Sequence, residues 1–582
     1  MRANERVIAR LALTTMAVAA LAACGGGGGE SARNELPAGI KEISATVYPA
    51  TSVGTGAIAA TQDLLTGGIG KTGLGVAAAP AYADPANPTA AELRRNALYS
   101  NYRGILDPSA NGGYGTLYGP NVTAQGQVTG GEGLIPGREY VAVLDDGTGR
   151  KQTVIAVQVP DSFSASNPCI VLGASSGSRG VYGAIGTAGE WGLKKGCAVA
   201  LTDAGKGVGL HNLADDTVNK IDGTRAPRAA AGALGFFAAA LSEASIYNYI
   251  GLTAMTARAA ARCDGLAAKG LVSGATTAER AADALAKLHA FGWTAESDSM
   301  HNAHYALGNG PILSAMYTMA YGRFGVEANL CGASFAAASA KGDVVAVAPA
   351  VLAQSFAIAN GTANGTPATV VYNDSVGGAK AWQFAVSPST GAADLGLDNA
   401  LCQYALVSGK DPATGAALTA ASTPTKAQSD AVRSGIAEVL HSANLRGKPA
   451  IIVAGRSDAL IPVNNNARAY TALNRTIEGA SSKLRYIEVT NGQHFDAFLP
   501  FSGFDTRFVP LHPYFNQAMD AMWAHLKNGA QLPASQVVRT TPRGGTPGAA
   551  PAITAAHVPP FVASPAAADQ IGFAGTSITV PR

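Results

Sequence analysis

The sequence predicts an α/β fold in which a mostly parallel sheet carries a helical, alanine-rich cap as an insertion. Two short apolar runs, 169–173 and 197–201, flank a helical stretch, and this strand–helix–strand order is typical of a parallel sheet covered on both faces. Strand patterns return at 449–453 and 484–489. Between the two groups, residues 229–342 are dense in alanine with helical spacing, which predicts the cap.

Two further elements follow from local pattern. The β-rich runs 139–144 and 153–159 are separated by Asp145-Asp-Gly-Thr-Gly149, which predicts a β-hairpin. Near the other end of the chain, His512–Asn528 has the pattern of a helix. Composition sets the expected boundaries: a Gly/Ala/Pro-rich stalk (25–90), the two parts of the sheet domain (91–228 and 343–535) and a Pro/Gly-rich tail (536–582).

The first 24 residues are expected to be a signal peptide of the lipoprotein type. A basic stretch ending at Arg10 leads into the apolar run Leu11–Ala22, which is too short to span a bilayer. The run ends in Leu21-Ala-Ala-Cys24, which resembles the bacterial lipobox, where the cysteine thiol is lipidated. The alternative is an ordinary cleaved secretory signal. We therefore expect export, with secretion or a lipid anchor in the outer membrane or periplasm, and no other membrane attachment.

Charge and cysteine content narrow the function. The 42 Lys and Arg against 39 Asp and Glu give a net charge of +3, and so weak a charge favours small or uncharged substrates over nucleic acid. Besides Cys24 the chain has five cysteines, an odd number, and export permits disulfides. Cys331 and Cys402 are plausible partners, which geometry must decide. No cysteines lie at zinc-ligand spacing, so we expect no metal site.

The clearest functional signal is an aspartate at the end of an apolar strand. The run Lys448–Pro462 passes from Ile451-Ile-Val453 into Gly455-Arg-Ser-Asp458, with a proline four residues later. Ligand sites of parallel α/β sheets form at such strand ends. Taken alone, Asp458 could equally be a turn residue or a helix cap.

A histidine follows the next strand. The run 484–489 leads into Thr490-Asn-Gly-Gln-His494, so an acid precedes a histidine, each after a strand, in the chain order of the α/β-hydrolase triad. Asp458 would orient the imidazole of His494, which would act as general base and then as general acid. His494 alone could be a polar residue at a strand end. The pair predicts an α/β-hydrolase-like ester hydrolase.

The nucleophile is less clear. The one Gly-x-Ser-x-Gly match is Gly173-Ala-Ser175-Ser-Gly177, directly after the strand at 169–173. It precedes the strand at 197–201, too early for the usual nucleophile elbow. We therefore favour an oxyanion loop, in which backbone N–H groups of Ser176, Gly177 and Ser178 stabilise the oxyanion, over Ser175 as a substitute nucleophile.

Other polar residues are weaker candidates. Asp496 lies only two residues beyond His494, and neighbours in sequence rarely face each other. Ser334, in Gly332-Ala-Ser-Phe, lacks the second glycine and is expected to serve packing. His301 and His304 could share a helix face as metal ligands, but no carboxylate or thiol completes a set.

These residues lie in stretches that resemble the D-(−)-3-hydroxybutyrate oligomer hydrolases of polyhydroxybutyrate-degrading bacteria. The resemblance covers roughly Leu93–Ala555. It implies a serine esterase without cofactor that cleaves short (R)-3-hydroxybutyrate oligomers, including the dimer, to the monomer. The matching stretches are Asn96–Arg103, Gly112–Pro120, Ser175–Gly183, Glu190–Cys197, Ile221–Arg225, Gly455–Asp458, Gln493–Phe498 and Val537–Gly545.

The chain departs from this family at the nucleophile. Family members carry a Ser-Asn-Gly-Gly-Gly elbow with the catalytic serine, in a block before the cap, and a cysteine expected near Ile250. This chain runs from Thr224 to Ser242 with no serine between. Two hypotheses follow: an esterase of 3-hydroxybutyrate oligomers that uses another serine, or a catalytically defective lipoprotein that binds oligomers on a hydrolase scaffold.

Overall fold

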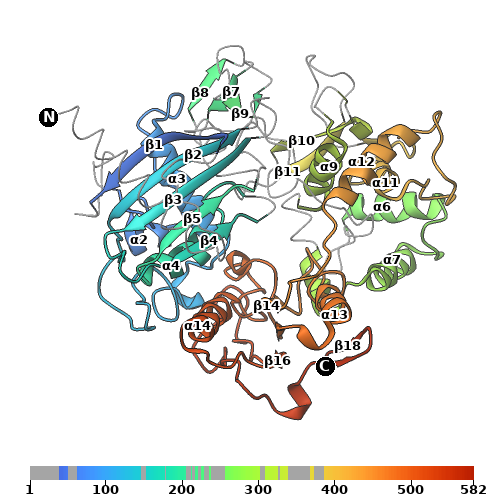
Figure 1. Cartoon of the computed structure of the whole chain (residues 1–582). Helices are drawn as coiled ribbons and strands as arrows, with labels where there is room; N and C mark the ends of the chain where they lie inside the picture. Colours follow the sequence, from blue (N-terminus) through green and yellow to red (C-terminus); the bar gives the residue numbers. More distant parts are fainter. Residues whose placement is uncertain are drawn as a thin grey trace. The chain divides into compact units, whose positions relative to one another are not determined.

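The computed structural model divides into two compact units, which are described separately (Figure 1). Unit 1 comprises Met1–Arg103, Gly119–Ala238 and Pro349–Asn364, and unit 2 comprises Gly104–Tyr118, Ala239–Ala348 and Gly365–Arg582. The residues that the structure describes are 38–49, 62–145, 152–176, 179–204, 211–212, 217–220, 224–227, 235–236, 256–301, 309–324, 328, 330–337, 368–372 and 386–582.

Unit 1 is built around a five-stranded sheet whose strands lie side by side in the order β1-β2-β3-β5-β4 (Figure 1). Three of its pairings, β1 with β2, β2 with β3 and β3 with β5, are antiparallel, and the pairing of β4 with β5 is parallel. The strands are β1 (Ile40–Tyr48), β2 (Gly137–Asp145), β3 (Gln152–Pro160), β4 (Ile170–Ala174) and β5 (Ala198–Thr202).

The prediction of a mostly parallel sheet, and with it the α/β-hydrolase-like fold, is therefore wrong. The predicted hairpin is present as β2 and β3, and the two apolar strands at 169–173 and 197–201 are parallel neighbours as expected. The hairpin joins the same sheet, because β3 pairs with β5 in the antiparallel direction. A strand's own side chains set which faces are buried but not which strand lies beside it, so local pattern left this pairing open.

Helices cover this sheet through close and partly polar contacts. Arg94 of α3 (Ala90–Arg103) is buried, and its Nε donates to Glu139 of β2 at 2.7 Å. On α4 (Glu190–Lys194), a side chain at Gly192 would meet Val199 at 2.7 Å, so glycine permits the close approach of helix and sheet. The unit also contains α2 (Gly70–Gly75) and a small antiparallel sheet of β6 (His211–Asn212), β7 (Thr217–Lys220), β8 (Arg225–Pro227) and β9 (Gly235–Phe236).

Unit 2 contains a separate three-stranded parallel sheet in the order β14-β15-β16. The chain passes from β14 (Ala450–Gly455) through α13 (Ala467–Glu478) to β15 (Leu484–Val489), then through α14 (His512–Asn528) to β16 (Gln536–Val538). The predicted strand ends and the helix at 512–528 are thus confirmed, whereas the predicted tail begins with a strand of this sheet.

The side chains of β15 point alternately to the two faces of the sheet, and each face is covered by a different helix. Tyr486 packs in a cluster with Ala467 of α13, whereas Ile487 and Val489 pack with Tyr514 of α14. Successive side chains of a strand point to opposite faces, so each face of β15 meets a different helix. Glu488 falls on the α13 face, although it is charged and fully buried.

The predicted cap range contains helices that pack with later ones. Buried residues of α6 (Ala257–Ala268), α7 (Thr277–Phe291) and α11 (Leu397–Ser408) form one cluster. α9 (Asn309–Gly322) and α12 (Lys426–Glu438) pack on the other side of α11. The remaining strands form short antiparallel pairs: β10 (Ala333–Ala337) with β11 (Ala368–Tyr372), β12 (Val386–Ser387) with β13 (Ala392–Ala393), and β17 (Gly572–Ala574) with β18 (Ser577–Thr579).

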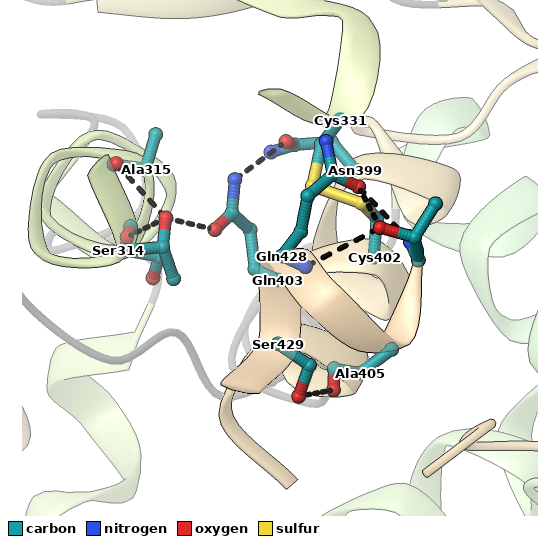
Figure 2. The surroundings of a disulfide bond; sticks show 11 residues. Ser314, Ala315, Cys331, Asn399, Cys402, Gln403, Ala405, Gln428 and Ser429 are labelled. Atoms are coloured by element: carbon teal, nitrogen blue, oxygen red, sulfur yellow. Dashed lines mark hydrogen bonds between the residues drawn. A yellow bond between two sulfur atoms is a disulfide. The ribbon is translucent and has the colours of Figure 1, made fainter. Parts of the chain in front are cut away.

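A disulfide ties this helical part together. Cys331, before β10, is bonded to Cys402 of α11, 71 residues away, so geometry decides in favour of this pairing. Figure 2 shows the Gln403 side chain of α11 pointing toward α9, the helix that carries Ser314 and Ala315. Its side-chain oxygen accepts a hydrogen bond from the Thr318 hydroxyl of α9 at 2.5 Å. Ser429 of α12 donates to the carbonyl of Leu406 at 2.8 Å. Polar contacts therefore connect α11 to both neighbouring helices.

The remaining described cysteines account for the odd count. Cys169 and Cys197 precede the paired residues Ile170 and Ala198 of β4 and β5, so the parallel register brings them together, and they form a disulfide. Cys263 is a buried free thiol. In the predicted stalk range, the structure has strand β1 and helix α2. Within the described residues, none of the helices combines the length and apolar character that crossing a bilayer requires.

Candidate active site

Asp458 lies in the turn that follows strand β14. Its Oδ1 accepts the backbone N–H groups of Leu460 and Ile461, each at 2.8 Å. These bonds hold the carboxylate in one orientation, as in other turns capped by an aspartate. The other oxygen, Oδ2, is left to face a partner from a different loop.

His494 is that partner, and the parallel pairing of β14 and β15 brings it there. The two strands end together at Gly455 and Val489. Beyond them, the loops touch at Gly455 and Gly492, where an added Cβ on Gly455 would lie 2.4 Å from the Gly492 carbonyl carbon. Ser457 N–H donates to the Gly492 carbonyl at 2.9 Å. Glycine at both positions therefore permits the contact that aligns the acid with the histidine.

The two side chains form a short charge-assisted hydrogen bond. His494 Nδ1 lies 2.7 Å from Asp458 Oδ2, and 24% of the histidine side chain and 13% of the aspartate side chain are exposed. A carboxylate at Nδ1 favours the imidazole tautomer that carries its proton on Nδ1, and in that tautomer Nε2 presents the lone pair. Among the described residues, none is hydrogen-bonded to Nε2. The geometry is that of a general base oriented by an acid.

Aromatic residues form the apolar surroundings of this pair. The Phe495 ring lies edge-on to the His494 ring at 4.4 Å and belongs to a buried cluster with Phe498, Phe504 and Ala459. The helical range contributes Trp293, whose Nε1 donates to the Ala459 carbonyl at 2.6 Å. Sequence reasoning missed these residues. The signal that could have revealed the phenylalanines is their spacing, with one at every third position from 495 to 504.

A buried ion cluster is bonded to the turn Gly455–Asp458, which we call the acid turn. Glu488 of β15 accepts from Arg456 Nε at 2.5 Å and from Arg468 Nη2 at 2.7 Å, and it also accepts from the Tyr486 hydroxyl at 2.7 Å. Burial alone would raise the pKa of Glu488, but the bonds and charges of these partners hold it below its ordinary value. Because Arg456 is two residues from Asp458, the cluster connects β15 directly to the acid turn.

Asp496, the weaker candidate for the acid, has a different position. Its carboxylate accepts the backbone N–H groups of Leu511 at 2.8 Å and His512 at 2.9 Å, at the start of α14. Burial is the main cause that raises the pKa of Asp496 to about 7; these two hydrogen bonds oppose the rise, and the charge of Asp107 adds to it. Asp496 therefore caps a helix.

Ser175 lies in unit 1, whereas Asp458 and His494 lie in unit 2. Its hydroxyl donates to the Arg179 carbonyl at 3.0 Å, and its backbone N–H donates to Thr202 at the end of β5. Ser176 is exposed, and its carbonyl accepts the Arg179 N–H at 3.2 Å. The other two predicted oxyanion residues, Gly177 and Ser178, lie outside the described residues.

Two of the remaining candidates, Ser334 and His301, lie in unit 2. Ser334 lies in strand β10, opposite Val371 of β11. His301 is buried, with Nε2 3.7 Å from Asp298, and His304 lies outside the described residues. Cys24, the predicted lipidation site, also lies outside them.

Comparison with known proteins identifies relatives along nearly the whole chain. The family model described as 3HB-oligomer hydrolase matches residues 20–254 and 240–582. A D-(−)-3-hydroxybutyrate oligomer hydrolase of Polaromonas naphthalenivorans is 40% identical over 98% of this chain and 98% of its own length. The protein of the same name from Cupriavidus necator is 39% identical over 95% of this chain and 94% of its own. No solved structure matches the chain.

One alignment also contains many positions that hold no residue of this chain. The D-(−)-3-hydroxybutyrate oligomer hydrolase of Albidiferax ferrireducens is 40% identical over 733 aligned positions that cover 100% of both chains. This chain has 582 residues, so at least 733 − 582 = 151 positions hold no residue of it. The two segments matched by the family model overlap at residues 240–254, and this range begins within the stretch Thr224–Ser242, in which the sequence lacks a nucleophile elbow.

Proposed function

Because this chain belongs to the 3HB-oligomer hydrolase family, we propose that it hydrolyses short (R)-3-hydroxybutyrate oligomers, including the dimer, to the monomer. The observation that carries the proposal is the 2.7 Å hydrogen bond between Asp458 and His494, with Nε2 of the histidine free to accept a proton. The family's substrate and the chemistry of this pair agree, since an ester is cleaved by a base-activated nucleophile.

The proposed reaction has two steps. His494 Nε2 removes the proton of an attacking hydroxyl, whose oxygen bonds to the ester carbonyl carbon. The ester C–O bond then breaks, and the leaving alkoxide receives that proton from the imidazolium, which gives an alcohol and an acyl-enzyme. Water, activated by the same histidine, hydrolyses the acyl-enzyme to the free acid. Asp458 holds the required tautomer and stabilises the imidazolium throughout.

We propose Ser175 as the residue to test first as the nucleophile. The Gly-x-Ser-x-Gly pattern and its place at the end of β4 support it. The loop that contains Ser175 is also the proposed source of the oxyanion donors. Because this loop precedes the strand at 197–201, its position in the chain favours the oxyanion role over the nucleophile role.

The second candidate function is oligomer binding without turnover. It is favoured by the positions that this chain lacks relative to its relatives, at least 151 in one alignment, and by the split of the family match beside Thr224–Ser242. A scaffold that retains the acid and the histidine but has lost the family serine would bind oligomers and release little monomer.

Monomer release from the 3-hydroxybutyrate dimer distinguishes the two functions. Purified full-length protein should release monomer above a heat-inactivated control, and a fluorophosphonate should label one serine that peptide mapping identifies. Labelling at Ser175 supports it as nucleophile, and labelling elsewhere removes it from that role. Absence of both release and labelling, with oligomer binding retained, would establish the binding function instead.

We also propose that the protein is exported and anchored by a lipid on Cys24. The lipobox-like Leu21–Cys24 supports the anchor, and the two disulfides support an oxidising compartment. Cells expressing the chain and fed radiolabelled palmitate should yield a labelled membrane-bound protein. Cys24→Ala should abolish the label and shift the protein to the soluble fraction; a labelled variant would contradict the proposal.

A further inference from the structure

A row of phenylalanine rings leads away from His494. We call Phe495, Phe498, Phe501, Phe504 and Phe508 the phenylalanine row; all belong to the loop between β15 and α14. Successive backbone bonds join Phe498 N–H to the Phe495 carbonyl, Phe501 to Phe498 and Phe504 to Phe501. In such turns of three residues, side chains three apart lie above one another. The spacing in the sequence therefore stacks the rings along one side of the loop.

The rings are in contact from the histidine onward. Centroid distances are 4.4 Å from His494 to Phe495, 5.4 Å from Phe495 to Phe498 and 5.5 Å from Phe498 to Phe501. Four of the five side chains are buried, but Phe501 is 46% exposed. The row is thus a mostly buried apolar stack that begins at the proposed base, and Phe501 is the ring that it exposes to solvent.

Arg507 places a positive charge beside the end of the row. Its guanidinium carbon lies 5.6 Å from the ring centres of both Phe504 and Phe508, and its Nε donates to the Gly503 carbonyl at 2.5 Å. The residue is exposed, and in the described part of the chain it forms no ion pair. These contacts orient the guanidinium and leave its two terminal NH₂ groups for a ligand.

The nearest carboxylate in the sequence does not compete for this charge. Asp505 is buried and accepts the backbone N–H groups of Gly503 at 2.9 Å, Gly548 at 2.8 Å and Ala550 at 3.3 Å. The same bonds fasten the loop to the C-terminal segment. At its other end, Val509 N–H donates to the Asn491 carbonyl at 3.0 Å, so the loop closes on itself three residues before His494.

We propose that Arg507 and the exposed edge of the phenylalanine row at Phe501 form the binding site for the carboxylate end of a 3-hydroxybutyrate oligomer. This inference rests on the proposed function, which supplies the substrate. Such an oligomer carries a methyl group on each unit and a single negative charge at one end. The exposed Phe501 ring suits a methyl-bearing unit of the chain, and an oriented arginine binds a carboxylate with two parallel hydrogen bonds.

Binding without turnover tests the site. In the full chain with His494→Ala, which cannot activate a nucleophile, calorimetry would measure the Kd of the 3-hydroxybutyrate trimer as free acid and as methyl ester. Adding Arg507→Gln should weaken binding of the free acid about fivefold to tenfold, the effect of one exposed charge-assisted pair. The Kd of the methyl ester should not change. Phe501→Ala should weaken binding of both compounds.

Arg475→Gln is the matched control, because Arg475 also lies over a ring, that of Phe573 at 4.9 Å. It should leave both Kd values unchanged. Equal effects of Arg507→Gln on acid and ester, no effect on either, or no binding of either compound would each overturn the proposed site. Since the assay needs no hydrolysis, absence of monomer release would count against the proposed function alone.

Discussion

Asp458→Asn should lower the rate constant for monomer release by about ten-thousandfold, as loss of the orienting acid does in serine hydrolases. The asparagine oxygen can still accept the N–H groups of Leu460 and Ile461, so the turn should persist. Its NH₂ group would face His494 Nδ1 where the carboxylate now accepts a hydrogen bond. The imidazole would then carry its proton on Nε2 and could no longer accept one from the nucleophile.

The measurement is kcat for the dimer, with His494→Ala beside it. His494→Ala should lower kcat at least as far, because it removes the base itself, and the double variant should fall little further, because residues that act as one unit do not contribute additively. Asp430→Asn is the control: Asp430 is an exposed residue of α12 paired with Lys426, and its replacement should leave kcat unchanged. Near-normal turnover by Asp458→Asn would remove the pair from the mechanism.

Glu488→Ala should produce a large loss of stability, about 3–5 kcal/mol in the free energy of unfolding. The variant leaves Arg456 and Arg468 without the carboxylate that both contact, and the Arg456 side chain, only 7% exposed, becomes an uncompensated buried charge. Denaturant unfolding would measure the change. Glu438→Ala is the control, since Glu438 and Arg323 are 53% and 63% exposed and such pairs contribute at most about 1 kcal/mol.

The same cluster predicts a dependence on pH. Because its partners hold the pKa of Glu488 below the ordinary value, its contribution is complete above about pH 4.3 and is lost as the pH falls through the pKa of the folded state. The native protein should therefore lose more stability on acidification than Glu488→Ala does. Parallel acid profiles for the two proteins would show that Glu488 carries no such coupling.

The acid turn, Gly455–Asp458, contains residues that contribute both to the stability of the fold and to the position of the candidate site. In the stretch Gly455-Arg-Ser-Asp458, the glycine permits the contact with Gly492, Arg456 is bonded to Glu488, Ser457 N–H donates to Gly492 and Asp458 meets His494. Four consecutive residues thus each make a different contact. Loss of the buried cluster should therefore also displace the aspartate.

The prediction from sequence was good where one strand or helix carries its own signal. The ends of β14 and β15, the helix at 512–528 and the hairpin of β2 and β3 have apolar periodicity and turn residues that can be recognised locally. Asp458 and His494 could be proposed as a candidate acid and base because each follows such a strand. The phenylalanine row was missed, because its spacing of three belongs to a loop in which no regular element was expected.

By itself, the sequence indicated the family, the strands β14 and β15 and the helix α14 that flank the candidate site, and Asp458 and His494 as candidate residues. Only the tertiary structure decided that the strands form separate sheets, that β3 joins β5 in the antiparallel direction, and that Trp293 and Glu488 support the acid turn. The reason is physical: periodicity records which face of an element is buried, whereas pairing and contact between distant segments depend on packing of the whole chain.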